Sequence, residues 1–271
     1  MIKRRYLIIT FSFALILFNS CANNHNKLLK SQDHDAKYEA AVKAFEKEDY
    51  FHASQLFENL LMYYRGRQKA EIVAFYYAKS LMGMKDYYSA GYQFESFYKR
   101  FPFSANAEEA LFLAADCKYK ESPDYTLDQT LTKEAMKDFQ SYVDKYPESE
   151  RVVLANKLMD ELREKLIKKD YESAYLYYKT GKFQSAQVML RLFLNNYPDS
   201  KYRQDAMYYI IDAGYELASN SVEKKQKERF ETVVSDCKKY ETLFVEQSNV
   251  RKNRLTYIYE QSKKKLGNIE K

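Results

Sequence analysis

A tetrapeptide of an aromatic residue, proline, any residue and serine occurs three times in this chain. It opens the stretches FPFSANAEEA, YPESERVVLA and YPDSKYRQDA, which begin at Phe101, Tyr146 and Tyr197. Proline lacks an amide hydrogen and restricts the residue before it, so it ends the preceding helix. The serine can accept a hydrogen bond from the first turn of the next helix as its N-cap. Each tetrapeptide therefore predicts the end of one helix and the start of another.

The residues around each tetrapeptide repeat a helical spacing. An alanine stands eight residues after each proline, at Ala110, Ala155 and Ala206. Before each proline, one small and two large side chains are spaced by four and then three residues, which places them on one helix face. The same pattern occurs once without a proline and once, more weakly, with Cys237 at a large-residue position. The five sets are Ala53, Phe57, Leu60; Ala90, Phe94, Phe97; Ala135, Phe139, Tyr142; Ala186, Leu190, Phe193; and Val233, Cys237, Tyr240.

The composition agrees with helices packed on helices. Six glycines and four prolines in 271 residues are few, so an all-α fold follows. The spacing resembles the tetratricopeptide repeat, a helical hairpin of about 34 residues. We therefore predict a right-handed α-solenoid of about five such hairpins and a short basic tail helix. The hairpins are expected near residues 36–65, 70–102, 105–147, 151–198 and 201–245, with an inserted loop over 120–131 and a long helix over 151–180.

The first 20 residues have the organisation of a signal peptide. Three basic residues precede an apolar stretch of 13 residues, which is too short to span a bilayer because a spanning helix needs about 20. Ser20 then precedes Cys21, and the segment resembles a bacterial lipobox, which implies removal of residues 1–20 and a diacylglycerol on Cys21. An ordinary secretory signal with an incidental cysteine is the alternative. We predict a lipidated flexible tether over 21–35, N-terminal repeats over 36–147, and C-terminal repeats with the tail helix over 148–271.

The charge pattern argues against a nucleic-acid partner. The formal net charge of +6 includes three basic residues of the signal peptide. Lysine and arginine are otherwise interspersed with aspartate and glutamate, as on solvated helix faces. Besides Cys21 the chain has Cys117 and Cys237, which we expect to be buried single thiols. A disulfide would require their Cα atoms to lie within about 7 Å.

The chain supplies few groups for catalysis or for a metal. Its three histidines are His25, His34 and His52, and the first two fall in the predicted tether, so a histidine-based triad or zinc site lacks material. No glycine-rich phosphate loop appears. Acidic clusters such as residues 46–49 are expected to be solvated helix faces rather than glycosidase carboxylates. We expect no enzymatic activity, no metal and no cofactor.

Two segments resemble one family of bacterial lipoproteins. They are LDQTLTKEAMKDFQSYVDKYPES, residues 127–149, and YESAYLYYKTGKFQSAQVMLRLFLNNYPDS, residues 171–200. The first places Asp128 and Gln129 before the second helix of the third hairpin, and the second contains a Tyr-Tyr-Lys-x-Gly-x-aromatic turn over 177–183. With the lipobox and the five hairpins, these segments resemble the BamD family of outer membrane protein assembly factors. The resemblance extends over nearly all of the chain after residue 20 and fades after about residue 215.

The resemblance implies a scaffold lipoprotein of the outer-membrane β-barrel assembly machinery, anchored by lipid on the periplasmic side of the outer membrane. It implies that the N-terminal repeats bind unfolded outer-membrane protein segments and that the C-terminal repeats bind a BamA-like insertase. The candidate groove residues, on the first helices of the hairpins, are Tyr38, Phe45, Phe75, Lys79, Phe112 and Tyr119. The candidate residues for the insertase are Lys182, Asn195, Asn196 and Tyr197. Each groove residue could instead pack one hairpin against the next.

Two other functions stay open on the sequence. One is a different periplasmic repeat adaptor that coordinates cell division or peptidoglycan synthesis, since such adaptors carry similar Tyr-Pro-x-Ser turns. The other is a glycan-binding lipoprotein of the SusD type, although those are usually longer and rich in tryptophan. This chain contains no tryptophan. The Asp-Gln loop and the Tyr-Tyr-Lys-x-Gly turn favour the assembly factor.

Overall fold

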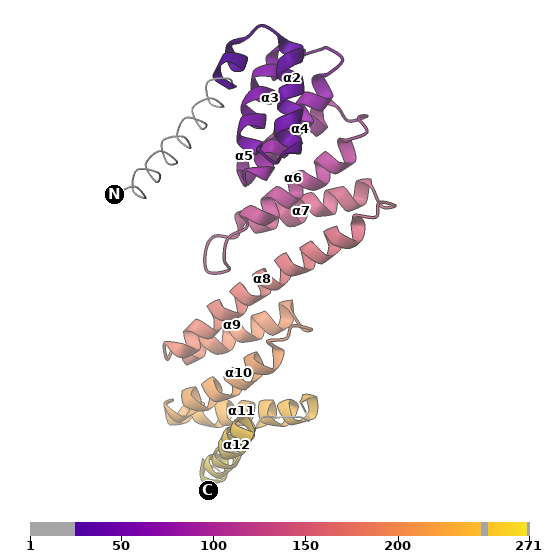
Figure 1. The fold of residues 1–271 in the computed structure, drawn as a ribbon. Helices are drawn as coiled ribbons and strands as arrows, with labels where there is room; N and C mark the ends of the chain where they lie inside the picture. Colours follow the sequence, from indigo (N-terminus) through magenta and orange to yellow (C-terminus); the bar gives the residue numbers. More distant parts are fainter. Residues whose placement is uncertain (1–24, 245–248, 270–271) are drawn as a thin grey trace, which may run out of the picture. The chain divides into compact units, whose positions relative to one another are not determined.

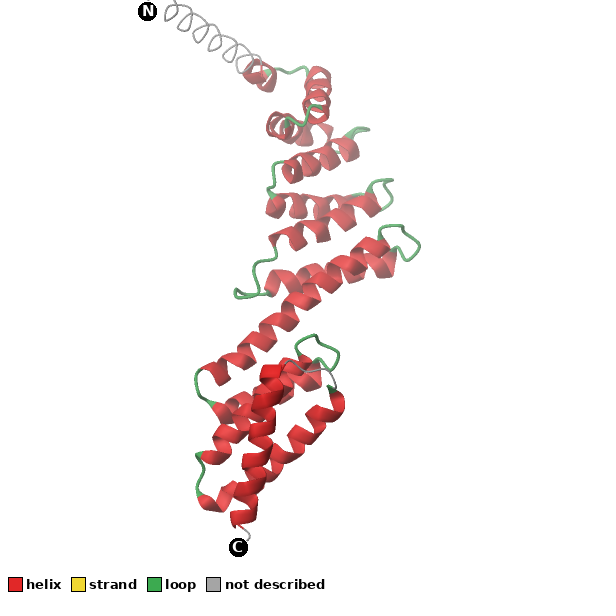
Figure 2. Cartoon of the chain, turned by 60° about the horizontal axis from the view of Figure 1, so that its bottom comes forward, coloured by secondary structure: helices red, strands yellow, loops and turns green. Residues whose placement is uncertain are grey.

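The structure is a computed structural model that describes residues 25–244 and 249–269. Within those ranges the chain forms helices joined by turns and loops, and no strand (Figure 2). Consecutive helices pair into hairpins, and the five that we predicted are all present. The helices, labelled in Figure 1, are α2 (His34–Glu46), α3 (Tyr50–Tyr64), α4 (Ala70–Gly83), α5 (Tyr87–Arg100), α6 (Ala107–Glu121), α7 (Thr130–Lys145), α8 (Val152–Lys179), α9 (Phe183–Asn196), α10 (Arg203–Ser219), α11 (Glu223–Leu243) and α12 (Asn249–Ile269).

The contacts divide the chain into two compact units. Among the described residues, one unit comprises 25–123 and 128–162, and the other comprises 124–127, 163–244 and 249–269. The division falls inside α8, later than the boundary that we predicted between residues 147 and 148. The reason is that the two halves of this long helix have different neighbours. Ala155 and Leu162 belong to a core with α6 and α7, whereas Ile167 and Tyr171 belong to a core with α9 and α10.

The repeated side chains form the hairpin cores, as the spacing predicted. Every member of the five small-large-large sets is at most 3% exposed. The three alanines that follow the prolines, Ala110, Ala155 and Ala206, are fully buried. Some of these rings meet edge-on or tilted, as Phe112 does with Phe139 at 5.7 Å between centroids, and Phe57 stacks on Tyr76 at the same distance. Such arrangements favour aromatic pairs beyond the burial of their area.

The serine of each proline tetrapeptide is not the N-cap that we predicted. Each serine lies three residues before the first residue of α6, α8 or α10. Its hydroxyl accepts a hydrogen bond from the amide two residues ahead, at 3.2 Å in all three cases. Its carbonyl accepts the first amide of the helix, at 2.9–3.0 Å. The serine therefore stabilises a separate turn that leads into the helix, which is a local hydrogen-bonding mode open to serine outside helices.

The turn inside a hairpin has one geometry in the first, second and fourth hairpins. A residue with positive φ, Glu48, Lys85 or Gly181, follows the first helix. The next amide bonds to the carbonyl five residues back, at 2.9–3.1 Å. This is the Schellman motif, and it usually contains glycine because a side chain disfavours positive φ. Asp49 and Asp86 then cap α3 and α5 through their carboxylates.

The third hairpin has a longer loop where we predicted one. Residues 122–129 separate α6 from α7. Gln129 is 4% exposed and accepts a hydrogen bond from the Thr132 hydroxyl at 2.8 Å. The carboxylate of Asp128 accepts the amide of Thr130 at 2.9 Å. The Asp-Gln pair therefore holds the start of α7.

The predicted flexible tether over 21–35 differs from the structure where the structure describes it. Residues 25–30 are helical, and Leu28 and Leu29 pack against the core of the first hairpin. His25 also bonds through Nε2 to the side chain of Gln55 at 2.8 Å. The prediction weighed the polar composition of this segment and missed the leucine pair, whose burial holds the segment on the fold. Residues 21–24 lie outside the described residues.

The tail helix is longer than we predicted. α12 has 21 residues, as many as α11. Leu255 and Ile258 are buried in a core with α10 and α11. Arg254 pairs with the carboxylate of Asp212, 4% exposed, at 2.7 Å. These contacts make α12 a structural part of the second unit.

Cys117 and Cys237 are free, buried thiols, as predicted. They lie in different units, one on α6 and one on α11. Burial raises the pKa of each thiol to about 12. Both groups therefore stay protonated at neutral pH, and protonated thiols are poor nucleophiles.

A hydrogen-bonded carboxylate connects α6 to the corner between α7 and α8. Glu108 accepts hydrogen bonds from the hydroxyls of Ser149, at 2.5 Å, and Tyr142, at 3.0 Å. These bonds, that from Ser149 most of all, lower the pKa of Glu108 below its ordinary value of 4.5. A depressed pKa in the folded state means that the ionised carboxylate stabilises the fold.

We expect the substitution Phe139→Ala to lower the free energy of unfolding by about 3–5 kcal/mol, because it leaves a cavity in a fully buried site. Phe103→Ala is the matched control, since Phe103 is fully exposed and its loss should cost less than about 0.5 kcal/mol. Urea unfolding followed by circular dichroism gives both values. Equal costs for the two variants would contradict the core described here.

We expect Glu108→Gln to destabilise the protein by about 1 kcal/mol at neutral pH, on the scale of a partly exposed charge-assisted hydrogen bond. The stabilisation is complete above the unfolded-state pKa of 4.5 and is lost as pH falls through the lower folded-state pKa. The difference between the variant and the parent should therefore shrink on acidification to about pH 3.5. Urea midpoints at several pH values measure it, and the exposed Glu150→Gln is the control. A difference independent of pH would refute the role given to this carboxylate.

Candidate protein-binding site

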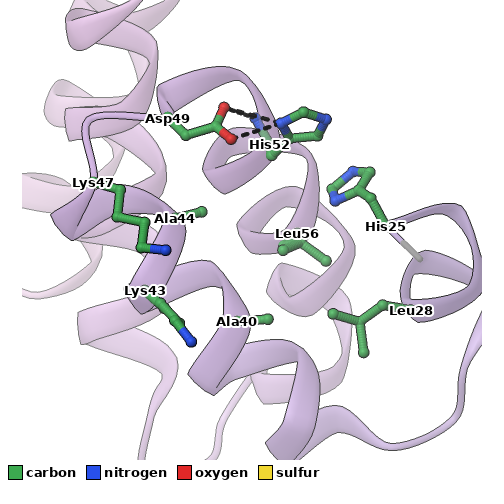
Figure 3. Close-up of a pocket in the computed structure, with 9 residues that line it drawn as sticks. All are labelled: His25, Leu28, Ala40, Lys43, Ala44, Lys47, Asp49, His52 and Leu56. Carbon is green, nitrogen blue, oxygen red and sulfur yellow. Dashed lines mark hydrogen bonds and ion pairs between the residues drawn. The ribbon is translucent and has the colours of Figure 1, made fainter. Parts of the chain in front are cut away.

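A pocket of about 290 Å³ opens between residues 25–30, α2 and α3 in the first unit (Figure 3). Its apolar lining comes from Leu28, Leu56, Ala40 and Ala44. The two alanines lie one turn apart on α2, and their small side chains leave the helix surface low between its neighbours. The hollow thus results from small residues on α2 facing a leucine on each side.

One edge of the pocket is cationic. Lys43, in the last turn of α2, and Lys47, the residue that caps its end, are exposed and sit across the pocket from His25 and His52 (Figure 3). Within the described residues, neither lysine has a carboxylate at ion-pair distance. Asp49, which also lines the pocket, bonds instead to Nδ1 of His52 at 2.8 Å. The positive charge of the two lysines is therefore available to a ligand.

The opposite wall is held by the two histidines. Their rings meet edge-on with centroids 4.2 Å apart. His25 is fixed by its bond to Gln55, and His52 by its bond to Asp49. Residues 25–30 therefore form a fixed wall. An apolar floor with a few convergent polar groups is the usual composition of a binding site. Here it suits a ligand with an apolar body and a negative charge.

Two of the predicted groove residues are buried inside their hairpins. Phe75 is 4% exposed and packs on Phe94, and Phe112 is 5% exposed and packs on Phe139. A peptide bound at the surface could reach neither ring. These two rings therefore pack helix against helix instead of lining a groove, because the first helix of a hairpin buries its aromatic face against the second.

Tyr38 and Phe45 are half-buried and both already have partners. The ammonium of Lys69 lies over the ring of Tyr38, 4.5 Å from its centroid. Phe45 meets the ring of Tyr76 edge-on, with centroids 4.9 Å apart. Each ring keeps part of its surface open to solvent. Neither lines the pocket beside residues 25–30.

Lys79 and Tyr119 are half-buried in polar contacts between helices. Lys79 pairs with Glu109 at 3.1 Å. Tyr119 donates its hydroxyl to Glu161 at 2.5 Å, and this bond raises the tyrosine pKa to about 12. The six predicted groove residues therefore do not converge on one cavity, and the four half-buried ones stay predictions.

The structure places the residues predicted for the insertase at the two ends of α9. Lys182 is exposed in the turn before α9, and Asn195 and Asn196 are exposed at its end. Tyr197 follows them and donates its hydroxyl to Asp170 at 2.7 Å. A helix of 14 residues is about 20 Å long, so these positions do not make one compact site.

An apolar stripe runs between those two ends. Val188 is 61% exposed and Leu192 is 48% exposed, and they lie one turn apart on α9. Asn195 and Asn196 continue the same face. Two exposed aliphatic side chains thus lie on α9 between the positions that we predicted for the insertase. The sequence pattern had not singled them out.

Cys21 lies outside the described residues, so its lipidation stays a prediction. Among the described helices, none has the length and apolar character needed to cross a bilayer. Nor do any three metal-ligating side chains in that part of the chain lie close enough together to hold an ion.

The comparison with family models decides the relationship. The model of the outer membrane lipoprotein family YfiO matches residues 30–263. The chain belongs to this family. The match covers every described hairpin, α12 included except for its last residues. The family description also agrees with the lipobox that we predicted at residues 17–21, which lie outside the described residues.

Two relatives carry the name of an assembly factor. One, from Aquifex aeolicus (strain VF5), is named for the outer membrane protein assembly factor BamD and is 26% identical over 256 residues, which are 93% of this chain and 83% of that protein. The other is the outer membrane protein assembly factor BamD of Caulobacter vibrioides (strain ATCC 19089 / CIP 103742 / CB 15). It is 21% identical over 131 residues, 48% of this chain and 43% of that protein.

Similar solved structures are a tetratricopeptide repeat protein of Bacteroides fragilis NCTC 9343 and one of Parabacteroides merdae ATCC 43184. The first is 13% identical with a TM-score of 0.38, and the second is 12% identical with a TM-score of 0.37. Each alignment covers 86% of this chain and 99% of the other.

The motif residues that carry the family resemblance have structural roles. Asp128 and Gln129 hold the start of α7, as described above. Gly181 adopts φ of +71°, which glycine tolerates best, and so permits the α8–α9 turn. Tyr178 donates its hydroxyl to the buried carboxylate of Asp212 on α10. These four residues of the two segments therefore help to build the fold.

The pocket residues were missed by the sequence analysis. His25 and His52 were weighed only as metal ligands or catalytic bases, and His25 was assigned to the tether. The alternation of Ala40, Lys43, Ala44 and Lys47 along α2 and its C-cap was a usable signal, because it predicts a low apolar strip with a basic edge. That signal becomes specific only once residues 25–30 are known to cover the strip.

Proposed function

We propose that this protein is a non-catalytic scaffold lipoprotein of the outer-membrane β-barrel assembly machinery. The observation that carries the proposal is the family match over residues 30–263, together with relatives that are named as assembly factors. Stacked helical hairpins support such a role, because they present long surfaces to other polypeptides. The two buried thiols, with pKa values of about 12, also suit a protein without nucleophilic chemistry.

In this proposal Cys21 carries the lipid that anchors the protein to the outer membrane on its periplasmic side. The lipobox at residues 17–21 and the family description support the anchor. Each buried methylene contributes roughly 0.8 kcal/mol, so two or three acyl chains hold a protein durably where one would not.

The pocket beside residues 25–30 is proposed to bind the end of an unfolded outer-membrane protein. The last strand of such a protein ends in apolar or aromatic residues and a carboxylate. Leu28 and Leu56 would contact the apolar side chain, and Lys43 and Lys47 would attract the carboxylate. The half-buried Tyr38, Phe45, Lys79 and Tyr119 are proposed as further contacts for the rest of the segment.

The exposed face of α9 is proposed to bind the BamA-like insertase. Val188 and Leu192 supply unburied apolar area, and Lys182, Asn195, Asn196 and Tyr197 supply polar groups at the two ends. An apolar centre with a polar rim is the usual composition of a protein interface.

Depletion of the protein is expected to lower the amount of β-barrel proteins in the outer membrane, and a BamA-like protein should co-purify with it from detergent. The double variant Val188→Glu/Leu192→Glu should lose most of this co-purification, because it places charges in the proposed interface. Quantitative proteomics of outer membranes and of the purified complex measures both effects.

The matched control is Val153→Glu/Leu154→Glu, an exposed apolar pair on α8 in the first unit. It should leave co-purification unchanged. Recovery of septal or peptidoglycan enzymes, with barrel proteins at normal levels, would replace the proposal with the adaptor function. An equal loss of co-purification in both double variants would show that α9 is not part of the interface.

We expect the full chain in detergent to bind a peptide of about ten residues, the length of one barrel strand, that ends in phenylalanine with a free carboxylate. The double variant Lys43→Glu/Lys47→Glu should weaken this binding about tenfold, because two attractive charges become repulsive. Fluorescence anisotropy of a labelled peptide measures the affinity.

The same peptide with an amidated end is the ligand control and should be insensitive to the charge reversal. Lys224→Glu/Lys225→Glu on α11 in the second unit is the protein control. An amidated peptide that binds as tightly as the free acid would exclude recognition of the carboxylate by these lysines.

A further inference from the structure

The first unit has a second pocket, of about 160 Å³, between α5, α6 and α7. It is distinct from the pocket beside residues 25–30 and shares none of its residues. α5, α6 and α7 each contribute to its lining, and the residues that matter here are Tyr88, Gly91, Tyr92, Glu121, Leu131 and Glu134.

Two tyrosines of this pocket are exposed and do not contribute to the hydrophobic core. Tyr88 is 79% exposed and Tyr92 is 67% exposed, and they lie one turn apart on α5. The core face of α5 is formed by Ala90, Phe94 and Phe97, so the two tyrosines have no part in hairpin packing. Among the described residues, no other ring and no cation contacts either of them. Exposed tyrosines of this kind are frequent binding anchors.

Gly91, which lines the pocket beside the two tyrosines, lets α5 approach α6 closely. A Cβ atom at this position would lie 3.2 Å from the Cβ of Cys117 on α6. A side chain at this position would push the two helices apart and alter the pocket that they line.

The charge of the pocket is acidic on a chain whose formal net charge is +6. Three carboxylates line it, Glu95, Glu121 and Glu134, against one ammonium, Lys118. That ammonium is already bonded to Glu95 at 2.8 Å and to Asp138 at 2.6 Å. Glu121 and Glu134 are exposed, and in the described part of the chain no lysine or arginine pairs with either.

We propose that this pocket binds an arginine side chain of another polypeptide. A guanidinium stacks on aromatic faces and donates hydrogen bonds in a planar fork to carboxylates, and the pocket offers both kinds of group. Its volume is close to that of a cavity of about 150 Å³ that holds one benzene molecule, so it suits one planar group. This site does not depend on the function proposed above.

A neighbouring pocket indicates a polypeptide rather than a free small cation. It has a volume of about 220 Å³ and shares Glu95 and Lys118 with the first. Leu111, Ala114 and Ser141 continue its lining along α6 and α7. A segment that places an arginine between the tyrosines could therefore place a neighbouring side chain in the second pocket.

Saturation-transfer difference NMR of the full chain in detergent tests the proposal with the tripeptide acetyl-Gly-Arg-Gly-amide as the probe. The matched ligand replaces arginine with citrulline, which has nearly the same shape and no charge. We expect the citrulline peptide to bind at least about fivefold more weakly. The variant Glu121→Gln/Glu134→Gln should weaken arginine binding about threefold or more and leave citrulline binding unchanged. Tyr88→Ala/Tyr92→Ala should weaken both.

All four positions are exposed, so circular dichroism and the urea midpoint should match the parent, which separates lost binding from lost folding. Glu148→Gln/Glu150→Gln, at the exposed corner between α7 and α8, is the protein control and should bind as the parent does. Equal binding of the arginine and citrulline peptides would overturn the proposal. Equal weakening of arginine binding by the control variant would also overturn it. A third contrary result is that spermidine binds more tightly than the peptide and that Glu121→Gln/Glu134→Gln abolishes this spermidine binding.

Discussion

The contact of a buried alanine on one helix with a pair of large side chains on the next underlies the whole structure. Ala110, Ala155 and Ala206 have no exposed surface, and neither do the rings of Phe94, Phe97 and Phe139. A small residue allows two helices to approach, and the large residues then fill the space beside it at the density of a protein interior. Because this contact recurs from hairpin to hairpin, each hairpin needs only its neighbours to complete its core.

This contact also explains how much of the fold could be predicted. The spacing that produces it is local in sequence, so the five hairpins, the loop after α6 and the length of α8 followed from residue periodicity alone. The division between the units did not, because it depends on which neighbour each half of α8 contacts. Residues 25–30 and α12 were underestimated for a similar reason: a few apolar residues in a polar segment are buried only when a distant surface is there to receive them.

The binding residues were less predictable than the fold, for a physical reason. Aromatic residues on the first helices were expected to line a groove. Some of these rings, such as Phe75 and Phe112, are instead buried in the hairpin cores. The polar and aromatic lining of the pockets comes from exposed residues that take no part in hairpin packing: Lys43 and Lys47 in the first pocket, and Tyr88 and Tyr92 in the second. The first unit thereby offers one cationic and one acidic pocket, so a partner with both charges could be recognised in a defined direction.

The fixed position of residues 25–30 has a consequence for a lipidated chain. Only three residues separate Cys21 from His25, and four peptide steps span at most about 14 Å. With acyl chains on Cys21, His25 and the pocket wall to which it belongs would stay within about this distance of the lipidated residue. A ligand would then meet the pocket close to the lipid headgroups rather than deep in the aqueous space.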